Sequence, residues 1–145
     1  MEPTAREWPA RLDVLPEVCG WVAARAVADG ADEDAAQDLR LAVEEIATNA
    51  INYGYPGRAP GRLAVQVQRA ADSIVVVFRD DAETFSPDRA PEPDVAAPVE
   101  SRRIGGLGWY LVRHLMQEVH HRPLGERGNE VTLVRRLDCR RPPQT

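Results

Sequence analysis

The chain has 145 residues, a length that suits one globular domain. Its 18 Lys and Arg residues against 23 Asp and Glu residues give a formal net charge of -5. An acidic protein lacks the basic face that non-specific binding to DNA or RNA requires. Every one of the 18 basic residues is arginine, which excludes a Walker-type phosphate loop because that loop depends on a lysine.

The cysteine content and the hydropathy of the chain exclude further classes of protein. Cys19 and Cys139 are too few for a disulfide framework, and their spacing does not suit a metal site. The charged start has no apolar signal core, and the longest unbroken apolar run, residues 74–78, is too short to cross a bilayer. We therefore expect a cytoplasmic protein that contacts neither membrane nor nucleic acid.

The first half of the chain predicts a strand, two helices and another strand. Residues up to about 11 suit a short edge strand, and residues 13–29 follow a helical period. A second, longer helix begins at Asp32, carries one apolar face, and stops at Gly54. Residues 62–68 alternate between apolar and polar side chains, as a half-buried strand does.

The second half contains a central strand, a long loop, a helix and a last strand. Residues 74–79, which contain that apolar run, suit a central strand, and the proline-rich segment 86–103 suits a mobile lid. We expect a helix over 107–119, with His114, His120 and His121 near its end, and a last strand over 131–136. Residues 140–145 look like a frayed tail. This order predicts a single α/β domain, a two-layer sandwich with helices on one sheet face.

The second predicted helix holds the most informative polar residues. At 100° per residue, Glu45, Asn49 and Asn52 fall within about 60° of one another, beside the apolar face. A carboxylate there can accept a proton, and an amide oxygen can ligate magnesium. The alternative is a solvated polar flank with an asparagine near a helix end.

Two further features lie along the chain. Asp80 follows the apolar strand, where it could accept a hydrogen bond from an exocyclic amine or act as a turn residue. Residues 104–109, IGGLGW, come after the lid and open a helix. Glycines at a helix start let backbone amides approach an anion, although glycines also end loops.

In this order, the motifs resemble a known family. The segments EEIATNAINYGYP, RDDAETFSP and RRIGGLGWYLVRHLMQEV, followed by GNEVTLVRR, resemble the N, G1 and G2 boxes of the GHKL ATPase superfamily. Within it, the chain is most similar to small bacterial anti-sigma factors that are serine-protein kinases of partner-switching systems. The similarity runs from about residue 12 to residue 136. It implies the Bergerat (GHKL) fold, with a mostly antiparallel sheet.

The resemblance implies roles for individual residues. Glu45 matches the general base that activates a partner's serine, and Asn49 matches the magnesium ligand next to the ATP phosphates. Asp80 matches the residue that binds the adenine amino group. Gly106 and Gly108 match the glycines that pack over the phosphates.

Other matches are looser. Gly105 adjoins the phosphate glycines, and Arg102 or Arg103 could touch the phosphates, although solvated lid charges are the alternative. Thr132 loosely matches a hydroxyl position near adenine. Ala82 stands where the G1 box usually has glycine; its methyl could crowd the adenine edge, and it would penalise a positive φ.

The resemblance implies an enzyme that uses Mg-ATP to phosphorylate a serine on a STAS-type antagonist of an anti-sigma factor. Such a protein regulates transcription, forms a homodimer, and can also bind a sigma factor. Ala82 favours an alternative, a nucleotide-impaired module that sequesters a sigma factor or an antagonist without kinase activity. A detached histidine-kinase catalytic domain is less favoured, because no separate dimerisation helix carries a phospho-accepting histidine.

Overall fold

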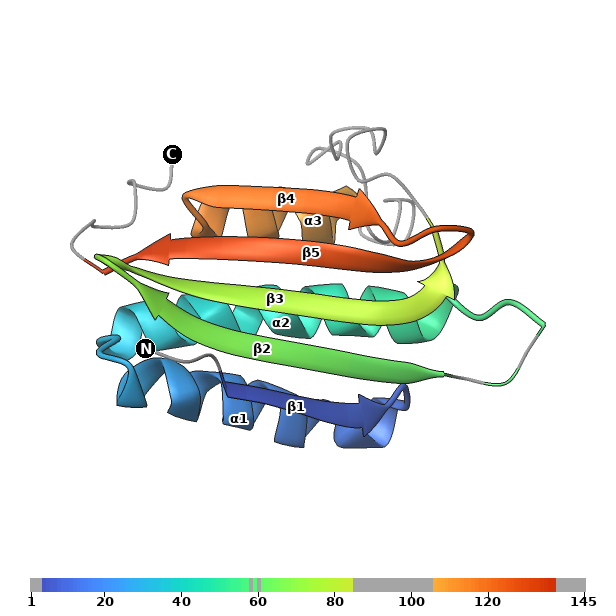
Figure 1. The fold of residues 1–145 in the computed structure, drawn as a ribbon, viewed down its shortest axis with the longest axis horizontal. Helices are drawn as coiled ribbons and strands as arrows, with labels where there is room; N and C mark the ends of the chain where they lie inside the picture. The colour runs from blue at the N-terminus through green and yellow to red at the C-terminus, as the bar shows by residue number, and fades with distance from the viewer. Residues whose placement is uncertain (1–3, 58, 60, 85–105, 138–145) are drawn as a thin grey trace.

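The computed structural model describes residues 4–57, 59, 61–84 and 106–137, and Figure 1 shows how they are arranged. The elements in chain order are β1 (Thr4–Pro9), the short 3-10 helix η1 (Leu12–Val14), α1 (Leu15–Ala28), α2 (Glu33–Tyr53), β2 (Arg62–Ala70), β3 (Ser73–Glu83), α3 (Gly106–Leu115), β4 (Glu118–Pro123) and β5 (Arg127–Arg136). The strands form one open sheet in the order β1-β2-β3-β5-β4, and every neighbouring pair is antiparallel. The helices lie together on one face of it (Figure 1), which confirms the two-layer α/β sandwich.

The two long helices form where the sequence predicts them. The Asp32 side chain accepts a hydrogen bond from the Ala35 backbone N–H at 2.8 Å and so caps the start of α2. The helix ends at Gly54, which is its C-cap. α1 begins after a single 3-10 turn, with Pro16 in its first turn, where the missing N–H of proline costs no helical hydrogen bond.

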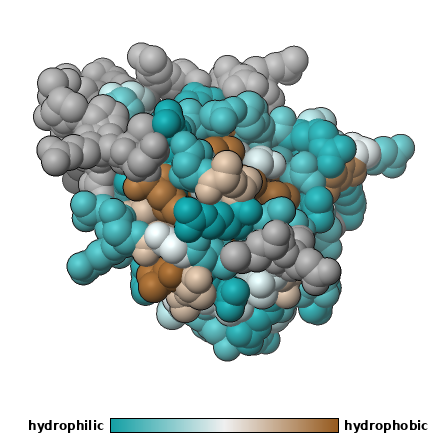
Figure 2. Space-filling model, turned by 60° about the vertical axis from the view of Figure 1, so that its left-hand side comes forward, coloured by the Kyte–Doolittle hydropathy of each residue, from teal (hydrophilic) through white to brown (hydrophobic). Residues whose placement is uncertain are grey.

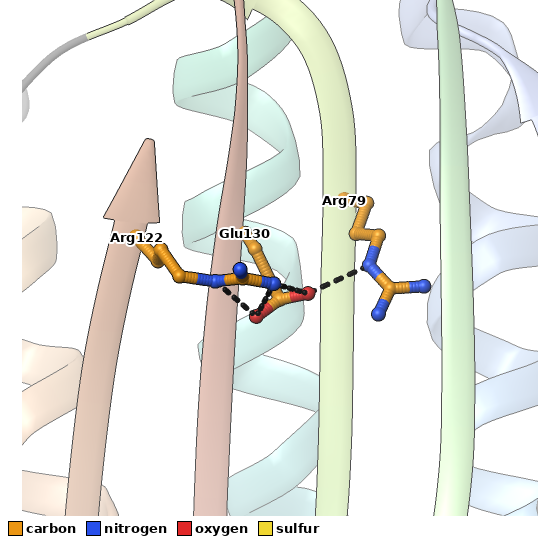
Figure 3. A network of polar contacts seen from close by, with 3 residues as sticks. All are labelled: Arg79, Arg122 and Glu130. Carbon is orange, nitrogen blue, oxygen red and sulfur yellow. Dashed lines mark hydrogen bonds and ion pairs between the residues drawn. The ribbon is translucent and has the colours of Figure 1, made fainter. Parts of the chain in front are cut away.

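Alternation along the strands gives the sheet two different faces. In β3, Ile74, Val76 and Phe78 are fully buried beneath the helices, and the intervening residues face the opposite, uncovered side. On that side Glu130 accepts hydrogen bonds from Arg79 and Arg122, which flank it on the neighbouring strands (Figure 3). The hydrogen bond from Arg122 is the main reason that the pKa of Glu130 is lowered, and the hydrogen bond from Arg79 lowers it further.

The segment after α3 differs from the prediction. The helix ends at Leu115, and residues 118–123 form β4, an edge strand that pairs with β5. From Val119 to Arg122, half-buried and exposed side chains alternate, and this period of two belongs to a strand rather than a helix. The prediction of a helix to residue 119 was therefore wrong, and His120 and His121 are strand residues. His114 lies in the last turn of α3, stacked on Tyr110.

Both central strands are longer than predicted. β3 continues to Glu83, so Asp80 lies within the strand rather than after it, and β5 begins at Arg127 instead of residue 131. The pairing of β3 with β5 shifts register between Asp80 and Glu83. A bulge of this kind bends a strand and can redirect a side chain, and here it lies beside a predicted site residue.

Several predictions concern residues outside the described part of the chain. These are the lid over 86–103, the tail over 140–145, and Arg102, Arg103 and Gly105. Within the described ranges, no helix is both long enough and apolar enough to span a membrane. Figure 2 shows one side of the molecule, where hydrophobic residues reach the surface in small patches separated by hydrophilic ones.

Candidate nucleotide site

α2 and α3 bring three of the predicted site residues together. Glu45 and Asn49 are one turn apart on α2, and Gly108 lies in the first turn of α3. A Cβ atom built at Gly108 would lie 2.8 Å from Glu45 Oε2 and 3.3 Å from Asn49 Nδ2. A side chain at position 108 would therefore push against both polar groups. Glycine lets the backbone of α3 lie directly against this pair.

The environment of Glu45 suits proton transfer. The residue is half-buried, and burial is the main reason that its pKa is raised, with the neighbouring carboxylate of Glu44 adding to the effect. A carboxylate with a raised pKa holds a proton more strongly than an ordinary glutamate does. Glu45 can therefore accept a proton from a hydroxyl placed beside it.

Asp80 is buried, with 7% of its surface exposed. Its Oδ1 atom accepts hydrogen bonds from Asn129 Nδ2 at 3.0 Å and from the Ala82 backbone N–H at 2.9 Å. Burial raises the pKa of Asp80, and these two hydrogen bonds act in the opposite direction. Its second oxygen, Oδ2, takes no hydrogen bond from the residues that the structure describes. Asp80 is thus held at one oxygen and can accept a donor at the other.

Asn129 is a site residue that sequence reasoning missed. Its side chain is completely buried, and it lies opposite Asp80 in the pairing of β3 with β5. A signal was present: Asn129, Val131 and Leu133 alternate on the buried side of β5, so a polar residue stands on a core-facing position. A buried amide needs partners, and such a position therefore marks a polar site.

Ala82, which stands at the usual glycine position of the G1 box, packs its methyl toward the end of α2. Ala71 is the one non-glycine residue with positive φ in the described part of the chain, so the backbone at Ala82 carries no such strain. Ala82 is 1% exposed, and a Cβ atom at Gly54 would lie 2.4 Å from the Ala82 methyl. The methyl is therefore packed against the end of α2, where glycine at position 54 makes room for it.

The structure does not bring Thr132 to this cluster. Thr132 pairs with Val77 and His120 on the uncovered face of the sheet, whereas Asp80 and Asn129 lie on the helix side. The sheet separates Thr132 from the cluster, and the residue that β5 places beside Asp80 is Asn129. Gly106 is the first residue of α3.

A profile of the histidine kinase-like ATPase domain family matches residues 8–135. The chain belongs to that family. The match covers every site residue described above, from Glu45 on α2 to Asn129 on β5.

Two curated relatives of this family member are named as serine-protein kinases. The chain is 31% identical to serine-protein kinase RsbW of Listeria monocytogenes over 102 residues, covering 68% of this chain and 63% of that protein. It is also 31% identical to serine-protein kinase RsbW of Bacillus subtilis over 91 residues, or 59% of this chain and 56% of that protein. The chain thus matches less than two thirds of the length of these relatives. The predicted resemblance to this group is confirmed.

Solved structures support the fold. The crystal structure of the RsbU and RsbW domains of Rv1364c from Mycobacterium tuberculosis superposes with a TM-score of 0.67 at 17% identity, covering 94% of this chain and 32% of that one. The histidine kinase domain of the blue-light-activated histidine kinase EL346 from Erythrobacter litoralis superposes with a TM-score of 0.52 at 22% identity. This superposition covers 85% of this chain and 61% of that one. At these identities the likeness concerns the fold alone.

The family implies ATP, and the residues present fit a nucleotide. Glycine at position 108 brings the start of α3, where backbone N–H groups can meet a phosphate, close to Glu45 and Asn49, and Asp80 offers a carboxylate oxygen to an amine. No group of three His, Cys, Asp or Glu side chains in the described ranges could hold a metal ion. A magnesium ion at Asn49 would therefore need oxygen ligands from elsewhere, and nucleotide phosphates can supply them.

Proposed function

We propose that this protein is an ATP-dependent serine-protein kinase. It binds Mg-ATP, phosphorylates a serine on a STAS-type antagonist of an anti-sigma factor, and regulates transcription by partner switching. The observation that carries the proposal is the convergence of Glu45, Asn49 and Gly108 from two helices. A base, a magnesium ligand and a helix start that begins with glycine form the set that phosphoryl transfer needs, because this reaction depends on positioning and charge neutralisation.

The roles follow from the chemistry of each group. Asp80 accepts a hydrogen bond from the adenine amino group, and Asn49 contributes an oxygen ligand to magnesium. The metal, when bound, neutralises charge on the phosphates. Glu45 takes the hydroxyl proton of the partner's serine while the serine oxygen forms a bond to the γ-phosphorus of ATP. At the same time the bond between the γ-phosphorus and the β-phosphate oxygen breaks, and ADP leaves.

The same carboxylate suggests how the partner leaves. Phosphorylation adds about -1.5 to -2 charge to the serine at neutral pH. That charge would lie beside Glu45, with the exposed Glu44 next to it. Repulsion between like charges would favour dissociation of the phosphorylated partner, leaving the protein available for a sigma factor.

Ala82 was the reason to consider a nucleotide-impaired module. The packing of its methyl against Gly54, away from solvent, supports a kinase over that alternative. A homodimer remains an expectation from the resemblance, and light scattering on the purified protein would test it.

Phosphotransfer to STAS-domain proteins from the same genome tests the proposal. Purified protein, Mg-ATP and each candidate are incubated together, and phosphoserine is located by mass spectrometry. Glu45→Ala should abolish transfer and keep ATP binding, whereas Glu44→Gln, a change at the exposed neighbour, should retain transfer. Transfer by Glu45→Ala at the wild-type rate would refute the role of Glu45.

A further inference from the structure

Three strands contribute to one chain of hydrogen bonds behind Asp80. Asn129 on β5 donates from Nδ2 to Asp80 Oδ1 on β3 at 3.0 Å and to the Glu83 carbonyl oxygen at 3.0 Å. On its other side, Asn129 Oδ1 lies 2.9 Å from His121 Nε2 on β4. The amide of Asn129 therefore links an edge strand to the carboxylate of Asp80.

The pattern fixes the direction of the Asn129 amide. An amide has two donor hydrogens on nitrogen and acceptor lone pairs on oxygen. Because Nδ2 faces two acceptors, Asp80 and the Glu83 carbonyl, Oδ1 faces His121, whose Nε2 then carries the hydrogen. A flip of the amide would place its oxygen against two other oxygens in a fully buried position, which is costly.

We propose that Asn129 is a positioning residue that sets the base selectivity of the nucleotide site, with His121 fixing the orientation of its amide. Asn129 occupies Oδ1 of Asp80 and leaves Oδ2 to meet the base. This inference rests on the proposed function, because it assumes that a purine nucleotide binds at Asp80.

The selectivity follows from donor and acceptor chemistry. An ionised carboxylate oxygen only accepts hydrogen bonds, so it attracts the 6-amino group of adenine and repels the 6-oxo group of hypoxanthine or guanine. Burial favours protonation of Asp80, and the hydrogen bond from Asn129 opposes it. Without Asn129, the Asp80 carboxyl would turn more freely and take up a proton more readily. A protonated carboxyl can donate to a 6-oxo group, so discrimination between the two bases would weaken.

Calorimetry with ATP and ITP on the full chain, at neutral pH with magnesium, tests the inference. These nucleotides share their phosphates and sugar, and their bases differ at the 6 position and in the hydrogen that hypoxanthine carries on N1. Asn129→Leu removes the amide at similar size, and we expect the ratio of ITP to ATP dissociation constants to fall at least ~10-fold. Val131→Ala is the matched control, because it removes two methyl groups from the same buried face of β5. We expect it to leave the ratio unchanged.

The outcomes separate this inference from the function on which it rests. A wild type that binds neither nucleotide would refute the proposed function and this inference together. A wild type that prefers ATP, with the same preference in Asn129→Leu, would refute the role of Asn129 alone. If Asn129→Leu does not fold, His121→Leu on the edge strand decides: we expect a ratio at least ~3-fold lower, and an unchanged ratio would overturn the inference.

Discussion

At the scale of single residues, the half-buried carboxylate of Glu45 serves the proposed reaction but lowers the stability of the fold. Burial and Glu44 raise its pKa in the folded state above the ordinary value of 4.5. Between 4.5 and the raised pKa, the folded protein binds more protons than the unfolded chain. Stability therefore falls as pH rises through that window, and the full cost of the ionised carboxylate is present above the raised pKa.

Replacing Glu45 with glutamine should remove this cost. We expect Glu45→Gln to have a higher thermal midpoint than the wild type at pH 7, and the difference should shrink as the pH is lowered toward 4.5. Scanning calorimetry at several pH values measures it, and Glu44→Gln, which removes only the smaller of the two causes, should give a smaller gain. A lower midpoint for Glu45→Gln at pH 7 would mean that the carboxylate stabilises the fold.

Ala82 and Gly54 form a matched pair of small residues. Because the Ala82 methyl fills the space above Gly54 and does not reach solvent, Ala82→Gly should change ATP affinity less than ~3-fold. It should also cost about 1 kcal/mol of stability through the lost methyl and the added chain entropy. Calorimetric titration and urea unfolding measure the two effects. A gain of tenfold or more in ATP affinity would show that the methyl does obstruct the base.

At the scale of elements, a buried ion pair joins α2 to the sheet. Arg135 Nε on β5 donates to Asp38 Oδ2 at 3.1 Å, and both side chains are almost completely buried. Asp38 lies two turns before Glu45 on the same helix, so this pair helps to set how α2 lies against the sheet.

Asp38→Leu would leave the Arg135 guanidinium buried without its carboxylate. Removing one partner of such a pair costs about 3–5 kcal/mol. Urea unfolding should show a loss of that size, and the double variant Asp38→Leu/Arg135→Met should recover most of it. A loss below ~1 kcal/mol in the single variant would mean that the pair does not hold the helix in place.

The elements differ in how well the sequence predicts them. α2 is predicted almost to the residue, because Asp32 caps its start, Gly54 marks its end and its apolar face is continuous. β4 is missed because Val119 continues the helical spacing of α3, and the hairpin that ends it depends on Gly125 and Gly128, which adopt positive φ. Asn129 is missed because β5 is expected to begin at residue 131, which leaves out the first core-facing position of its alternation.

At the scale of the whole molecule, the proposed nucleotide site draws its residues from four elements of the sandwich. Glu45 and Asn49 come from α2, Gly108 from α3, Asp80 from β3 and Asn129 from β5. The sequence predicts Glu45, Asn49, Gly108 and Asp80 through their motifs, and the geometry brings Gly108 close to Glu45 and Asn49. The pairing of Asp80 with Asn129, and the placement of Thr132 on the other face, depend on strand register, which residue types alone do not determine.

The most direct test is magnesium-dependent ATP binding, measured by calorimetry on the wild type, Asn49→Ala and Asn52→Ala. Asn52 is exposed one turn beyond Asn49 and serves as the matched control. We predict that the wild type and Asn52→Ala bind ATP more tightly with magnesium than without it. Asn49→Ala should lose most of that gain, at least ~10-fold in affinity. Equal magnesium dependence in all three proteins, or no binding by the wild type at millimolar ATP, would contradict the account.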